Sequence, residues 1–144
     1  MNLLIVDDEY LVVEEVVTVT DWELLGITEI YSATNAVSAV RILNEKKIDI
    51  MICDIEMPQT DGLELSKKAK ENFPDLEIVM LTSHAEFNYV RNALRYGCYD
   101  YLLKPVMEDD IIKVMKNLVT KIERERHQAQ LQEEGIVWNP VSYT

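Results

Sequence analysis

The segment Ile48–Gly62, IDIMICDIEMPQTDG, decides how the rest of the chain can fold. It begins with an almost unbroken apolar run that is too short for a typical helix, and its Met-Pro and Asp-Gly pairs then supply turn residues. Such a run is typical of a strand buried on both faces of a sheet. Asp54 follows directly, so we expect its carboxylate at the carboxyl end of a central strand, where open α/β sheets bind ligands. An aspartate that only begins a loop would give the same local pattern.

The composition favours one soluble domain followed by a tail. The chain has 144 residues, and its 14 Lys and Arg against 26 Asp and Glu give a net charge of −12. This charge disfavours direct binding to nucleic acid or to an anionic membrane. No apolar segment has membrane-spanning length, and acidic residues follow the first apolar residues too soon for a signal peptide, so we expect a cytoplasmic protein. Cys53 and Cys98 are expected to be reduced core residues.

Short apolar runs alternate with helical patterns along the chain. Strands are predicted near residues 3–6, 29–33, 48–53, 78–81 and 99–103, and helices near 10–22, after a cap at Asn35, over 63–72 and 85–96, and from Glu108 onward. Five such repeats with short connections predict a five-stranded parallel sheet with right-handed crossovers and helices on both faces. The expected fold is therefore α/β, a doubly wound (βα)5 three-layer sandwich.

Polar side chains follow four of the predicted strands, and parallel strands end at the same edge of a sheet. They are Asp7 with Asp8, Asp54, Thr82 with Ser83, and Lys104. Carboxylates brought so close repel one another, and a divalent cation with oxygen ligands, above all Mg²⁺, relieves the repulsion. Asp54 could then act as a nucleophile toward a phosphoryl group, with Lys104 and Thr82 stabilising the charge on its oxygens. The pattern predicts a phosphoryl-transfer site.

Four segments resemble the receiver domain of bacterial two-component response regulators, and the resemblance covers Met1 to about Leu118. They are LLIVDDE, CDIEMPQTDG, MLTSH and YDYLLKPV, each at the strand end where this family carries its functional residues. The resemblance implies the flavodoxin-like receiver fold. It also implies a phosphoacceptor that catalyses its own phosphotransfer and dephosphorylation, rather than an enzyme acting on other molecules, with a sensor histidine kinase as the phosphoryl donor.

The resemblance also implies a role for each site residue. Asp54 would be the phosphorylated aspartate, and Mg²⁺ would be bound by Asp8, Asp54 and the backbone carbonyl of Glu56, with Asp7 acting through water. Thr82 and Lys104 would contact the phosphoryl oxygens. Tyr101 would rotate inward when Thr82 moves, and the Lys104–Pro105 peptide bond would be cis. Glu56, Met57, Ser83 and His84 occupy the positions that vary within the family and would tune the lifetime of the acyl phosphate. His127, in a charged helix, is expected to face solvent.

The segment FNYVRNALRYGCYDYLLKPV resembles receivers joined to AraC-type helix-turn-helix DNA-binding domains. We therefore expect a receiver domain over residues 1–122, and over 123–144 a linker helix extension and tail leading to an output domain that lies outside this chain. DNA would be bound only through that domain. An aromatic-rich surface is expected to support homodimerisation on phosphorylation; its residues are Tyr89, Val90, Ala93, Tyr96, Tyr99, Tyr101 and Val106.

Other classes of protein share parts of this pattern. A haloacid-dehalogenase-type phosphohydrolase also has an aspartate nucleophile and Mg²⁺, but it has a second Asp where Glu56 stands here. A flavodoxin-like cofactor binder would need Ser, Thr or Gly to bind phosphate where Asp7 and Asp8 stand. A receiver-like module without phosphorylation would not need the full set of site residues.

Overall fold

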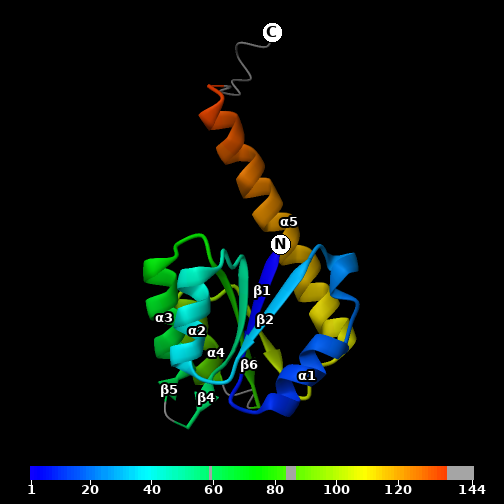
Figure 1. Cartoon of the computed structure of the whole chain (residues 1–144), viewed down its shortest axis with the longest axis vertical. Helices are drawn as coiled ribbons and strands as arrows, with labels where there is room; N and C mark the ends of the chain where they lie inside the picture. The colour runs from blue at the N-terminus through cyan, green and yellow to red at the C-terminus, as the bar shows by residue number, and fades with distance from the viewer. Residues whose placement is uncertain (59, 84–86, 136–144) are drawn as a thin grey trace.

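A parallel sheet forms the centre of the computed structural model, which describes residues 1–58, 60–83 and 87–135 (Figure 1). The sheet has five strands in the order β2-β1-β3-β6-β7. Their bounds are β1 Asn2–Val6, β2 Glu29–Ala33, β3 Ile50–Asp54, β6 Glu77–Thr82 and β7 Asp100–Leu103. All four pairings are parallel, so the predicted five-stranded parallel sheet is confirmed.

Helices cover both faces of the sheet. They are α1 Tyr10–Thr18, α2 Ala36–Glu45, α3 Gly62–Asn72, α4 Phe87–Arg95 and α5 Glu108–Glu133. α1 and α5 lie on one face, and α2, α3 and α4 lie on the other (Figure 1). The α/β three-layer architecture predicted from the sequence is therefore confirmed.

The first helix is shorter than the sequence predicted. It was expected to reach Trp22, but α1 ends at Thr18 and a separate 3₁₀ helix, η1, runs from Trp22 to Leu25. The Trp22 indole is buried and donates a hydrogen bond of 3.0 Å to the carbonyl of Val16. The chain must turn to bring the indole back under the end of α1, and this turn interrupts the helix.

A small antiparallel ribbon, which the sequence did not predict, follows the central strand. It consists of β4 Glu56–Met57 and β5 Thr60–Asp61, with Glu56 paired to Asp61. The turn residues noted in the sequence therefore form a hairpin that returns the chain to the end of β3.

Alternate residues of the strands divide the core in two. One cluster includes Leu3, Ile5, Ile50 and Ile52 and packs against α1 and α5. The other includes Leu4, Val6, Met51 and Cys53 and packs against α2, α3 and α4. Because strand side chains alternate, Asp7 and Asp54 continue the first set, whereas Thr82 and Tyr101 continue the second. The strand ends therefore place Asp7 and Asp54 on one face and the hydroxyl residues on the other.

Several local predictions are confirmed. The Asn35 side chain caps α2 by accepting a hydrogen bond of 2.8 Å from the backbone N–H of Ser38. The Lys104–Pro105 peptide bond is cis. Cys53 and Cys98 are both buried and unpaired, and burial raises the pKa of the Cys98 thiol to about 11.

The last helix extends well beyond the sheet (Figure 1). Its buried side chains end at Ile122, and residues 123–130 are exposed, including His127 as predicted. Among the described residues, no helix is both long enough and apolar enough to cross a membrane.

Candidate functional site

The predicted site residues gather at the carboxyl ends of β1, β3, β6 and β7. Asp7 and Asp8 follow β1, Asp54 is the last residue of β3, Thr82 the last of β6, and Lys104 follows β7. A cleft beside them is lined by residues that include Asp8, Glu9, Asp54, Glu56, Met57, Ser83 and Lys104. The fold therefore brings together the residues that the sequence pattern singled out.

Lys104 lies between two buried carboxylates. Its Nζ is 2.8 Å from Asp7 Oδ2 and 3.3 Å from Asp54 Oδ1. Asp7 is 0% exposed and Asp54 is 3% exposed. A buried carboxylate without a partner is costly, so the lysine compensates part of the charge that burial opposes.

Backbone groups of the adjoining loops hold both carboxylates in place. The N–H of Glu9 donates to Asp7 Oδ1 at 2.9 Å, and the N–H of Glu56 donates to Asp54 Oδ1 at 3.3 Å. Each bond spans two residues, as in the Asx-turns that aspartates form at the start of loops. The loop-forming interpretation of Asp54 therefore describes its local geometry, but this aspartate is also buried and paired with Lys104.

The electrostatics of the site are those of acids crowded together. Burial, together with the negative charge of Asp7, raises the pKa of Asp54 from 3.8 to about 6, and Lys104 offsets part of this effect. Burial disfavours the charge of Lys104, but its pairing with Asp7 and Asp54 outweighs burial and raises the lysine pKa. One lysine does not fully compensate the two buried acids, so a further cation would be favourable here.

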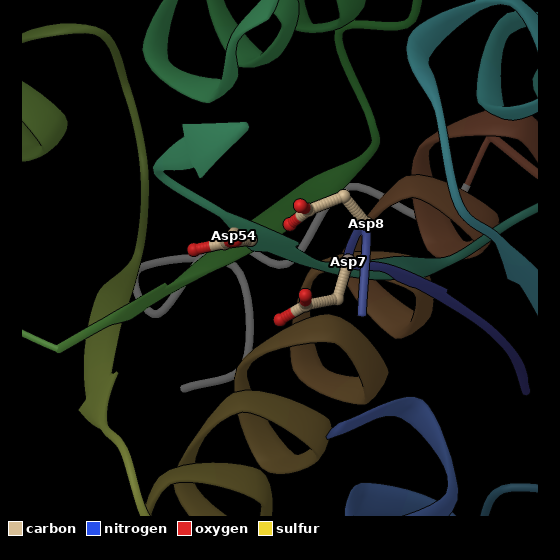
Figure 2. A group of neighbouring side chains, drawn as sticks. All are labelled: Asp7, Asp8 and Asp54. Carbon is tan, nitrogen blue, oxygen red and sulfur yellow. The ribbon is translucent and has the colours of Figure 1, made fainter. Parts of the chain in front are cut away.

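The three acids fit the donor set that a hard divalent cation requires. One carboxylate oxygen each from Asp7, Asp8 and Asp54 lies within 4.8 Å of the others. Figure 2 shows the three side chains extending from the ends of β1 and β3 toward a common space. Asp8 is exposed, so the arrangement is open to solvent on one side, as a site that keeps water ligands needs to be.

Gly62 is a site residue that the sequence suggested only as a turn glycine. A β-carbon added at this position would overlap the backbone carbonyl oxygen of Asp54 and crowd the α-carbon of Ile55. The N–H of Gly62 also donates to the carbonyl of Ile55 at 2.9 Å. Only glycine allows β5 and α3 to approach the Asp54 backbone so closely. The Asp-Gly pair was the available signal, but it does not reveal which backbone the glycine contacts.

Thr82 and Tyr101 lie on adjacent strands on the other face of the sheet from Asp7 and Lys104. Thr82 is 1% exposed. Tyr101 pairs in register with Met80 and packs, half-buried, against the cluster beneath α2, α3 and α4. Ser83 is exposed at the cleft and so is the Glu56 side chain, while His84 lies outside the described residues.

The predicted aromatic-rich surface is partly wrong. Ala93 is 1% exposed because it lies on the side of α4 that faces the sheet, and its carbonyl accepts a hydrogen bond from the backbone N–H of Cys98. Tyr99 and Val106 pack against the core beneath α1 and α5. Tyr96 is exposed, with Leu94 and Leu103 as further exposed apolar residues of this region. The side chains of Tyr89 and Val90 lie outside the described residues.

Residues 3–116 match the family model described as the response regulator receiver domain. The transcriptional regulatory protein YesN of Bacillus subtilis is 34% identical over 124 residues, which cover 86% of this chain and 34% of YesN. The receiver (REC) domain of AraT, a response regulator from Geobacillus stearothermophilus, is 30% identical with a TM-score of 0.80, covering 87% of this chain and 97% of that one.

A two component transcriptional regulator AraC from Clostridium phytofermentans has the same fold, with a TM-score of 0.80 at 23% identity, over 88% of this chain and 98% of that one. This likeness concerns the fold alone. The chain spans about a third of the length of its relative YesN, and it covers nearly all of the two solved structures.

Proposed function

This chain belongs to the response regulator receiver domain family, and on that basis we propose that it accepts a phosphoryl group on Asp54 from the phosphohistidine of a sensor kinase. Membership in this family decides against a dehalogenase-type phosphohydrolase and against a flavodoxin-like cofactor binder. One observation carries the proposal: Asp54 is 3% exposed, it borders the cleft, and its Oδ1 lies 3.3 Å from the Lys104 ammonium.

In the proposed reaction a carboxylate oxygen of Asp54 attacks phosphorus, and the bond from phosphorus to the histidine nitrogen breaks. The electron pair of that bond remains on the imidazole, and Asp54 becomes an acyl phosphate. Lys104, whose Nζ is 3.3 Å from Asp54 Oδ1, would follow the negative charge from the carboxylate to the phosphoryl oxygens. Thr82, at the end of the neighbouring strand, would supply a hydroxyl donor to another of these oxygens.

The metal is proposed to be Mg²⁺, held by Asp8, Asp54 and the Glu56 carbonyl, with Asp7 acting through water. When bound, it would supply positive charge that neutralises the carboxylates and the phosphoryl oxygens. The grouping of Asp7, Asp8 and Asp54 within 4.8 Å supports this donor set. Dephosphorylation by water would occur at the same site.

The proposed output is transcriptional. We assign residues 1–122 to the receiver and 123–144 to the linker toward an output domain, of AraC-type by the resemblance of residues 87–106. A receiver that controls a DNA-binding domain acts in the cytoplasm. Because this chain carries a net charge of −12, DNA contact is left to the output domain. Phosphorylation would shift Thr82 and Tyr101 and favour pairing of two receivers across the region of α4 and β7.

Intact-mass measurement tests the proposal. Incubation with acetyl phosphate and Mg²⁺ should add one phosphoryl group to the chain, with acetate as the leaving group. The adduct should be absent without Mg²⁺ and absent in Asp54→Asn. A receiver-like module that does not accept phosphate would give no adduct under any of these conditions, and an adduct that persists in Asp54→Asn would place the acceptor elsewhere.

A further inference from the structure

Two buried acids lie at the amino end of the sheet, far from the cleft. Asp49 precedes β3 and is 6% exposed, and Glu77 begins β6 and is 7% exposed. Neither residue lines the cleft at Asp54. β3 follows Asp49 and ends at Asp54, whereas β6 begins at Glu77 and ends at Thr82. The two strands that present the site thus each begin at a buried carboxylate.

Both acids pair with cations on α5. Asp49 Oδ1 pairs with the guanidinium of Arg126, and its Oδ2 accepts a hydrogen bond of 2.7 Å from the backbone N–H of Asn2. Glu77 Oε1 lies 2.7 Å from Lys121 Nζ, with Lys70 Nζ at 3.8 Å. Exposed ion pairs contribute little, but a buried carboxylate that loses its partner is costly. The carboxylates of both pairs are buried, whereas the Arg126 and Lys121 side chains are 48% and 40% exposed.

Apolar packing does not explain how the end of α5 is held. Ile122 is its last buried side chain, whereas the helix continues to Glu133. Arg126 lies about one helical turn beyond Ile122. A polar helix without packing has little to keep it in one orientation, because most helical stability in proteins comes from tertiary contacts. The pair with Asp49 is the described contact that joins this exposed turn to the sheet.

We propose that Asp49 and Glu77, acting through Arg126 and Lys121, hold α5 against the amino end of the sheet and fix the direction in which its extension leaves the domain. The part of the chain that is fixed to the domain then extends to Arg126, beyond the domain boundary at residue 122 expected from the sequence. Figure 1 shows this extension leaving at the end of the sheet opposite to β4 and β5. The extension of α5 is thereby oriented relative to the strands that carry Asp54 and Thr82. This role of α5 does not depend on phosphorylation of Asp54.

Pulsed electron paramagnetic resonance between two spin labels measures how uniformly the extension of α5 is held relative to the domain. Labels at Arg41→Cys on α2 and Gln132→Cys on the extension, both exposed positions, report the distance from the body of the domain to the helix end. The native Cys53 and Cys98 are buried and should not be labelled under native conditions. The test variant is Arg126→Ala. The matched control is Arg124→Ala, an exposed arginine on the same helix that has no ion pair among the described residues.

We expect one narrow distance distribution in the otherwise unmodified protein and in Arg124→Ala, and loss of the narrow peak in Arg126→Ala. Arg126→Lys, which keeps the charge, should restore part of it. A double variant, Asp49→Asn with Arg126→Ala, removes the unpaired buried charge and should also be broad, which separates loss of the contact from unfolding. Circular dichroism checks that helix content is kept. A narrow peak that survives Arg126→Ala, or a broad one before any substitution at Arg126, would overturn the proposal.

Discussion

The ammonium of Lys104 lies 3.3 Å from Oδ1 of Asp54, so the proposed phosphoacceptor is paired with a cation before any phosphoryl group arrives. The same ammonium lies 2.8 Å from Asp7 Oδ2. A lysine in this position partly neutralises the two acids. It is also within reach of the oxygens that a phosphoryl group on Asp54 would bring. The two roles can be separated by substitution.

Lys104→Ala should keep Mg²⁺ binding and lose much of the response to phosphorylation. The lysine and the metal are both cations, so its removal does not weaken the attraction of the carboxylates for Mg²⁺, whereas the phosphoryl oxygens lose a partner. Calorimetric titration with Mg²⁺ and the rate of adduct formation with acetyl phosphate measure the two effects. Lys67→Ala, an exposed lysine above the ring of Tyr96, is the control. A collapse of metal affinity in Lys104→Ala would mean that the lysine organises the metal site itself.

Asp54→Asn should stabilise the metal-free protein at neutral pH, by about 1 kcal/mol after allowance for screening by solvent at the cleft. Burial and the charge of Asp7 raise the pKa of Asp54 from 3.8 to about 6, so the folded state holds this proton more tightly than the unfolded state does. Stability is therefore lost as the pH rises from about 4 to 6, and the ionised carboxylate remains unfavourable above that range.

Urea unfolding at pH 7.5 and at pH 4.5 tests the sign of this effect. The advantage of Asp54→Asn should be present in full at pH 7.5 and clearly smaller at pH 4.5, where the carboxyl of the folded parent protein is largely protonated. Mg²⁺ should stabilise the parent protein more than the variant. Equal stability of the two proteins at pH 7.5 would show that Lys104 compensates the burial of Asp54 in full. Asp21→Asn, an exposed position outside the site, provides the comparison.

Gly62→Ala should lower the free energy of unfolding by about 3 kcal/mol and weaken Mg²⁺ binding. The added β-carbon would overlap the carbonyl oxygen of Asp54, and backbone cannot move aside as a flexible side chain does. Gly26→Ala is the matched control, because its φ of 90° is strained for alanine but the nearest atom, Val119 Cγ1, is 3.6 Å away. We expect that control to cost about 1 kcal/mol and to leave metal binding unchanged. Wild-type metal affinity in Gly62→Ala would contradict the proposed role.

Phosphorylation should convert the domain from monomer to dimer. Leu94, Tyr96 and Leu103 are exposed apolar residues of α4, the segment after it and β7, and β7 is an edge strand. Sedimentation velocity with and without beryllofluoride and Mg²⁺ measures the change. Asp54→Asn should remain monomeric under both conditions, and Tyr96→Ala should weaken the dimer. A monomer at high concentration with the adduct present would refute dimerisation by the receiver alone.

The sequence alone was sufficient to predict the sheet and its helices, apart from the end of the first helix, and to place the candidate site residues at one edge of the sheet. Apolar runs such as Ile50–Cys53 are short and uninterrupted because the strand is buried on both faces, and this pattern is local. Because parallel strands end at the same edge of a sheet, the predicted strands also placed Asp7, Asp54 and Lys104 at one edge. The cis bond at Lys104–Pro105 was expected from the family resemblance and is present.

Only the tertiary structure decided which distant groups meet. Arg126 and Asp49 are 77 residues apart, and neither has a sequence signal that indicates a pair. The overlap that excludes a side chain at Gly62 depends on how closely a hairpin returns to the backbone of Asp54. Periodicity indicates which face of an element is buried, but it carries no information on which partner fills the space. The prediction of an aromatic-rich surface was based on residue type and not on periodicity, and it misplaced Ala93 on the surface. Burial, pairing and close approach are properties of the assembled layers.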